Sequence, residues 1–157
     1  MLPGVSAGPG RSMLFANQIA AIIRHDIAEV FFESRLPGLR AWTARQCARQ
    51  GRRIHQLTDD ERRDYAETYL RLTRVVDGRA EPQDHLLAVY HRAGARFVRL
   101  IENGYQDAPS LNFGVLCVLP NPAPAWVRRR AAFRALAGRT LALASRSPRL
   151  MRGTFGG

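Results

Sequence analysis

Apolar residues recur three and four positions apart through much of the chain, and this spacing is the strongest constraint on its fold. In the stretch LFANQIAAIIRHDIAEVFFESR, residues 14–35, the apolar positions with this spacing are Phe15, Ile19, Ile22, Ile23, Ile27, Val30 and Phe31. Residues three or four apart share one face of a helix. The pattern therefore predicts one buried amphipathic helix across the stretch, which Pro37 and Gly38 end.

Capping and turn residues delimit the next two predicted helices. The second covers residues 39–50 and ends near Gly51, because glycine commonly follows a helix end. Thr58 and Glu61 have the spacing of a capping box, in which each side chain bonds the other residue's backbone N–H, so a third helix begins there. Its apolar face is Tyr65, Tyr69, Leu72 and Val76, and Asp77–Gly78 end it.

Two more helices are expected, with an extended segment between them. Pro82 suits the first turn of the fourth helix. The apolar stripe of this helix runs through Leu86, Tyr90, Ala93, Phe97 and Leu100, up to Asn103–Gly104. Residues 112–120, NFGVLCVLP, are a short apolar run that we interpret as an isolated strand or an extended buried segment, since one strand alone makes no sheet. The fifth helix covers residues 125–145.

These elements predict an all-α protein, a single-domain bundle of about five helices with one short extended apolar segment. A chain of 157 residues is long enough for one such core. Residues 1–12 are rich in glycine and proline and are expected to form a flexible arm, and residues 13–157 the single helical domain. Cys47 and Cys117 lack CxxC spacing and have apolar neighbours, so we expect buried free thiols.

Positive charge is the second strong feature of the sequence. All 24 basic residues are arginine, against 13 acidic residues, and the net charge is +11. The surplus comes from two blocks without any acidic residue, 34–57 and 108–157. Like-charged blocks repel each other in a compact fold, and an anionic partner relieves that repulsion. Nucleic acid is the commonest such partner, because each neutralised phosphate releases a counterion.

Arginines gather on one face of two predicted helices. Arg45, Arg49 and Arg52 are four and three positions apart, and no acidic residue lies near them in the sequence. A helical wheel of the last helix places Trp126, Phe133, Ala137 and Ala144 toward the core, with Arg128, Arg139 and Arg146 opposite.

We therefore expect a small basic protein that contacts DNA or RNA mainly through phosphate, as an accessory or structural component of a nucleoprotein assembly. The candidate contact residues are Arg45, Arg49, Arg52, Arg53, Arg128, Arg129, Arg130, Arg134, Arg139 and Arg146.

Two alternatives fit the same charge. The first is a protein-binding module that docks on an acidic partner protein, with Val115, Leu116 and Val118 pairing with that partner's sheet edge. The second is peripheral binding to an anionic membrane through the last helix, whose Trp126 and Phe133 suit the interface.

Other classes of function lack support in the sequence. The motifs GxSxG, GxGxxG, HExxH, CxxC and the P-loop do not occur, so we expect no enzyme activity and no cofactor. His25 and Glu29 have metal-ligand spacing on a helix, but no second pair accompanies them, so no metal site is expected. Neither a secretory h-region nor a run of 18 apolar residues occurs, and we expect a cytoplasmic protein without a transmembrane segment.

Overall fold

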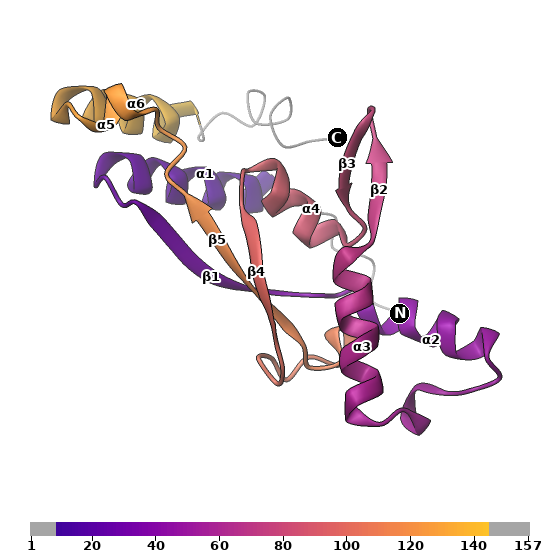
Figure 1. Ribbon diagram of the computed structural model, residues 1–157. Coiled ribbons are helices and arrows are strands. Elements are labelled where there is room, and N and C mark those ends of the chain that lie inside the picture. The colour runs from indigo at the N-terminus through magenta and orange to yellow at the C-terminus, as the bar shows by residue number, and fades with distance from the viewer. Residues whose placement is uncertain (1–8, 145–157) are drawn as a thin grey trace. The chain divides into compact units, whose positions relative to one another are not determined.

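The computed structural model describes residues 9–144, with side chains described for residues 16–143. The helices are α1 (Pro9–Arg24), α2 (Leu39–Arg49), α3 (Asp59–Arg71), α4 (His85–Arg92), α5 (Ala125–Arg128) and α6 (Ala131–Ala144). The strands are β1 (Glu29–Arg35), β2 (Thr73–Val76), β3 (Arg79–Pro82), β4 (Arg96–Ile101) and β5 (Gly114–Pro120), and two 3-10 turns are η1 (Ile54–Gln56) and η2 (Ala108–Ser110). The prediction of an all-α bundle is wrong, because the strands form a three-stranded and a two-stranded sheet (Figure 1).

The chain divides into two compact units. Unit 1 combines the described residues up to Val30 with those from Pro120 onward, and unit 2 is Phe31–Leu119. Of the segment expected to be a flexible arm, Pro9–Ser12 belong to α1, and residues 1–8 lie outside the described residues.

The first long helix expected from the sequence is a helix followed by a strand. Asp26 takes a left-handed φ of 52°, which ends the helical path just after α1. The residues beyond it, rich in valine and phenylalanine, form β1. Phe31, assigned to the buried face of a helix, is 61% exposed on this strand.

The expected third helix also ends early. Its start is confirmed: the Thr58 hydroxyl accepts a hydrogen bond from the Glu61 N–H at 3.2 Å, and the Glu61 carboxylate accepts from the Thr58 N–H at 2.8 Å. However, α3 stops at Arg71, and Asp77–Gly78 are the turn of the β2–β3 hairpin rather than a helix end. Both turn residues have positive φ, 50° and 75°, as a two-residue hairpin turn requires.

The expected fourth helix is likewise split by one glycine. Gly94, with φ of 89°, follows the last turn of α4, where its N–H bonds the His91 carbonyl and the Ala95 N–H bonds the Tyr90 carbonyl. This arrangement is the Schellman helix end, which favours glycine. The chain then continues as β4, so Phe97 and Leu100 lie on a strand and not on a helical stripe.

The apolar run 112–120 is neither isolated nor merely extended. It contains β5, the central strand of the sheet β1-β5-β4, and β4 pairs with it antiparallel (Figure 1). The buried core of unit 2 gathers on this strand and on the neighbouring helices. Its members are Leu36, Leu39, Ala66, Tyr69, Leu87, Phe113, Val115 and Cys117. The prediction of buried free thiols is confirmed for Cys47 and Cys117.

A buried carboxylate connects three helices of unit 2. Asp84, 2% exposed, is the N-cap of α4, and its Oδ1 accepts from the backbone N–H groups of Leu86 and Leu87. Its Oδ2 accepts from the Gly38 N–H at 3.1 Å and from the Tyr69 hydroxyl at 3.0 Å. Asp84 thereby ties the start of α2 and one turn of α3 to the start of α4.

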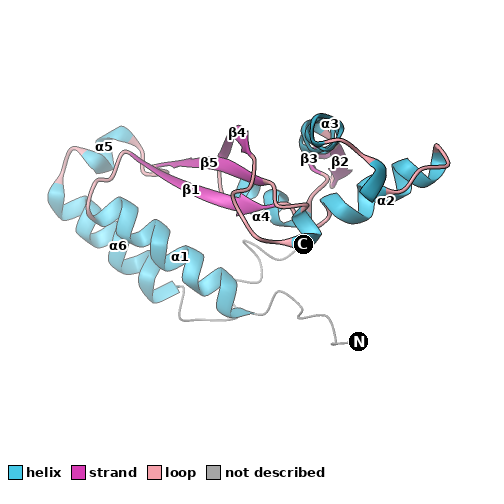
Figure 2. Ribbon diagram, turned by 90° about the horizontal axis from the view of Figure 1, so that it is seen from below, coloured by secondary structure: helices cyan, strands magenta, loops and turns pink. Residues whose placement is uncertain are grey.

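Unit 1 is built on α1 and α6, which lie side by side (Figure 2). Gly138 makes this approach possible, because a Cβ there would lie 3.1 Å from the Ala20 carbonyl oxygen and 3.1 Å from the Arg24 Cβ. The last predicted helix is in fact α5 followed by α6. The expected core position of Trp126 is wrong, since this side chain is 64% exposed.

Candidate anion-binding site

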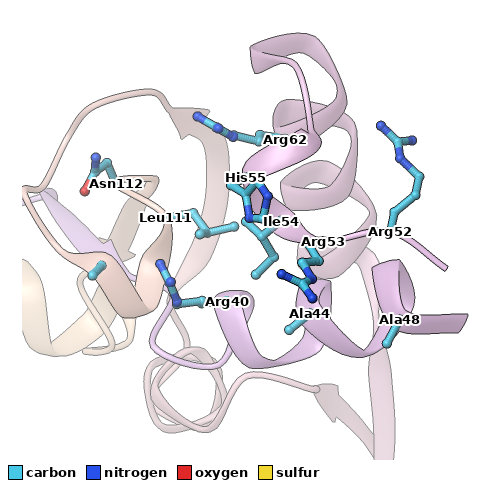
Figure 3. A pocket seen from close by; sticks show the side chains of 11 residues that line it. Arg40, Ala44, Ala48, Arg52, Arg53, Ile54, His55, Arg62, Leu111 and Asn112 are labelled. Atoms are coloured by element: carbon cyan, nitrogen blue, oxygen red, sulfur yellow. The ribbon is translucent and has the colours of Figure 1, made fainter. Parts of the chain in front are cut away.

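A cavity of about 610 Å³ lies in unit 2 between α2, η1, α3 and the segment after η2 (Figure 3). Its polar lining comes from Arg40, Arg52, Arg53, His55, Arg62 and Asn112. Every one of these side chains carries a hydrogen-bond donor, and four are guanidinium groups. No acidic residue is among the lining residues in the described part of the chain.

The burial pattern of α2 explains why one face of this helix lines the cavity. The helix buries Leu39, Thr43 and Cys47, four residues apart, against the core of unit 2. The residues one position further on, Arg40, Ala44 and Ala48, therefore form the adjacent face and line the cavity. Because Ala44 and Ala48, one turn apart, have small side chains, this face of α2 leaves room for long side chains from the neighbouring segments.

Two of the four arginines are already paired. Arg52 donates to both oxygens of Glu61, at 2.7 and 3.0 Å. This hydrogen bonding, with a further bond from the Thr58 N–H, lowers the pKa of Glu61 to about 2, and it raises the pKa of Arg52. Arg62 pairs with Asp59 at 3.2 Å. Arg52 and Arg62 are therefore largely neutralised by acidic residues at the start of α3.

The other donors have no acceptor within the described residues, and the side chains of Arg40, Arg53 and Asn112 are exposed. Within residues 9–144, Arg40 and Arg53 take part in no ion pair or hydrogen bond through their side chains, and their guanidinium groups flank Ile54 and His55 in the view of Figure 3. The Nε of Arg62 is buried and lacks an acceptor among the described residues. The carbonyl oxygen of the Asn112 side chain accepts from the Asp107 N–H at 3.0 Å, which leaves its NH₂ group available.

Such a site favours anions. The nearby carboxylates pair with Arg52, Arg62 and Arg35, so none of them pairs with Arg40 or Arg53. An anion with several oxygen acceptors can satisfy guanidinium and amide donors together, and guanidinium groups match phosphate with two parallel hydrogen bonds. The volume falls in the range of small-molecule sites, about 300–1,000 Å³.

The candidates of the first arginine block divide between this cavity and the outer surface of α2. Arg52 and Arg53 line the cavity, whereas Arg45 and Arg49 are exposed outside it. Although no acidic residue lies near Arg52 in the sequence, the fold brings Glu61, nine residues further along the chain, to bond it. Sequence reasoning missed Arg40, although it belongs to the same acid-free block.

The candidates of the second block belong to unit 1 and serve varied local roles. Arg128 pairs with Asp26 at 2.8 Å, and Arg134 donates to the Arg128 carbonyl. Arg130 lies over the Phe133 ring, 5.4 Å from its centroid. The two remaining described candidates, Arg129 and Arg139, are exposed. Arg146 lies outside the described residues.

The residues proposed to contact a partner's sheet edge lie on β5. Val115 and Val118 are buried, and Leu116 is half-buried. Since β5 is hydrogen-bonded to β1 on one side and β4 on the other, a partner strand would have to displace one of them.

Among the described side chains, no group of three or more His, Cys, Asp or Glu is placed to hold a metal ion. The described helices include none that is long and apolar enough to cross a membrane. The sequence matches no protein-family model and no curated protein, and the fold matches no solved structure.

Proposed function

We propose that the protein binds nucleic acid through its phosphates and anchors a backbone phosphate in the cavity of unit 2. The observation that carries this proposal is the set of donors that line the cavity without a protein acceptor: the Arg40 and Arg53 guanidinium groups, the Arg62 Nε and the Asn112 amide. Of these groups only the Arg62 Nε is buried without an acceptor among the described residues, which is costly in the free protein. The side chains of Arg40, Arg53 and Asn112 are exposed and have no protein acceptor for these donors. A phosphate supplies the missing acceptors and the missing negative charge.

The proposed contact is to the backbone rather than to bases. Arginine contacts with phosphate fix the position of a nucleic acid without reading its sequence. Exposed Arg45 and Arg49 extend the positive surface along α2 beyond the cavity, with no acidic residue between positions 34 and 57. This arrangement suits an accessory or structural protein of a nucleoprotein assembly.

The test is binding to random-sequence duplex DNA and single-stranded RNA by fluorescence anisotropy, across a salt series. The logarithm of the affinity falls with the logarithm of salt concentration by about 0.9 per phosphate contact on duplex DNA. The double variant Arg40→Ala/Arg53→Ala is therefore expected to weaken binding and to reduce this slope by roughly 2.

The matched control is Arg74→Ala/Arg79→Ala, which removes two exposed arginines from the β2–β3 hairpin and leaves the cavity intact. It is expected to change the slope less than the cavity variant does. An unchanged slope in Arg40→Ala/Arg53→Ala would refute the assignment of the cavity. If inorganic phosphate or a mononucleotide bound as tightly as the polymer, the cavity would be a small-ligand site and the proposal would be wrong.

A further inference from the structure

The outer face of α6 is apolar and exposed. The helix packs on α1 through the side that carries Gly138, which is buried. Leu136 and Leu143 lie roughly opposite Gly138 at 100° per residue, and they are 61% and 63% exposed. Phe133, on the same outer side, is 38% exposed. Phe133, Leu136 and Leu143 thus point away from the helix on which α6 packs, whereas Leu141 is half-buried.

An aromatic and cationic group extends this face at the α5 end. Trp126, 64% exposed, packs edge-on against Phe133 with ring centroids 5.8 Å apart. Arg129 and Arg130 line the same recess as these two rings, and both are exposed. We call the group Trp126, Phe133, Leu136, Leu143, Arg129, Arg130 and Arg139 the α5–α6 face.

The positive charge of this region indicates that a partner covering the face is anionic. The sequence from position 108 to 157 has eight arginines and no acidic residue. Arg129 and Arg139 form no ion pair with any described residue. Apolar side chains flanked by exposed arginines, with a tryptophan at one end, are the pattern of a helix that lies in a membrane interface. Arginine keeps its charged head among lipid phosphates while its neighbours enter the acyl region.

We propose that the α5–α6 face binds the surface of an anionic lipid bilayer, with α6 lying along the interface. The helix cannot span the bilayer: its 14 residues make about 21 Å, against roughly 30 Å of hydrocarbon. This site is in unit 1 and does not depend on the phosphate-binding cavity of unit 2. Variants at the two sites are therefore expected to act separately.

The experiment uses the full chain and two kinds of vesicle, phosphatidylcholine alone and phosphatidylcholine with one-quarter phosphatidylserine. Binding is measured by co-sedimentation, and insertion by quenching of tryptophan fluorescence with brominated acyl chains. We expect binding to the anionic vesicles only, weakened by salt. Because Trp42 is the other tryptophan, the quenching is expected to disappear in Trp126→Tyr.

Two variants separate the apolar and the electrostatic parts. Leu136→Ser/Leu143→Ser is expected to reduce partitioning at least 10-fold, while Val75→Ser, at a residue 75% exposed on β2, leaves it unchanged. Arg129→Ala/Arg130→Ala is expected to reduce partitioning about 25-fold, since each arginine near an anionic surface contributes roughly fivefold. The control for charge is Arg74→Ala/Arg79→Ala.

Three results would overturn the proposal. The first is equal binding to neutral and anionic vesicles, and the second is no binding to either. The third is a concentration-dependent dimer that Leu136→Ser/Leu143→Ser abolishes, because a second copy would then cover the face. The cavity variant Arg40→Ala/Arg53→Ala is expected to keep full vesicle binding, so failure of the nucleic-acid proposal remains distinguishable from failure of this one.

Discussion

Replacing Asp84 by alanine tests the packing argument for unit 2. The carboxylate accepts four hydrogen bonds, from two N–H groups of α4, the Gly38 N–H and the Tyr69 hydroxyl. Asp84→Ala removes both acceptor oxygens, and with them all four hydrogen bonds, at a residue that is 2% exposed.

The expected loss of stability follows from two contributions. Loss of an N-cap costs about 0.5–2 kcal/mol. A buried donor left without an acceptor costs about 1–3 kcal/mol, and the Tyr69 hydroxyl, on a residue only 5% exposed, becomes one. We expect Asp84→Ala to reduce the free energy of unfolding by roughly 1.5–5 kcal/mol. Asp84→Asn keeps the Oδ1 acceptor of the cap and is expected to cost less than half as much.

The assay is urea unfolding followed by circular dichroism, for the single variants and for a double-mutant cycle with Tyr69→Phe. Because the two side chains share one hydrogen bond, their effects are expected to be non-additive by about 1 kcal/mol or more. A loss below 1 kcal/mol in Asp84→Ala, or full additivity in the cycle, would refute the claim that this carboxylate links the three helices.

Further expectations concern a close contact, pH and the thiols. Gly38→Ala is expected to destabilise the fold by about 1–3 kcal/mol, since its methyl group would overlap the Tyr69 hydroxyl; a thermal melt equal to the parent's would contradict the contact. Ion pairing lowers the pKa of Glu61 from its usual 4.5 to about 2, so the stabilisation it provides is complete above pH 4.5 and is lost as pH falls toward 2. Glu61→Gln should therefore flatten the acid side of the stability profile, and an unchanged profile would count against the pair. Burial raises the pKa of Cys117 to about 12. At pH 8, iodoacetamide is therefore expected to leave this buried thiol unlabelled in the folded protein and to label it once denaturant has unfolded the chain.

Local signals in the sequence predicted the start of α3 and the extent of α2, but Pro82, expected in the first turn of the fourth helix, is the last residue of β3. The Thr58 capping box and α2 were recognised because a cap and a glycine act within one turn. The errors arose where helical spacing continued past a single residue of positive φ. Asp26, Gly78 and Gly94 each turn the chain out of a helix or into a hairpin, after which residues with the same spacing form strands. Short apolar runs rich in valine, isoleucine and phenylalanine fit both the helical and the strand pattern.

The candidate site could be predicted only in part, for reasons of distance along the chain. Arg52 and Arg53 stood out by charge, whereas Asn112 enters the cavity from a segment some sixty residues away. The acid-free blocks also misled, because folding brings Asp26 to Arg128 and Glu61 to Arg52.

The wheel of the last helix was wrong about its buried side. The wheel assigned the bulky side chains to the core, but α6 contacts α1 at the small residue Gly138. Phe133, Leu136 and Leu143 are consequently left on the outside.

The division of the chain into units has a consequence for the order of folding during synthesis. Unit 2 is one continuous segment, Phe31–Leu119, and all its contacts can form as soon as β5 has left the ribosome. Helix α1 emerges before unit 2, yet the helix against which it packs, α6, emerges only after the whole of unit 2. Helix α1 therefore lacks this packing partner until the residues of α6 have been translated. A nascent chain stalled before α6 has been translated leaves α1 without its packing partner. Chaperone binding to the nascent chain is best measured at this stage.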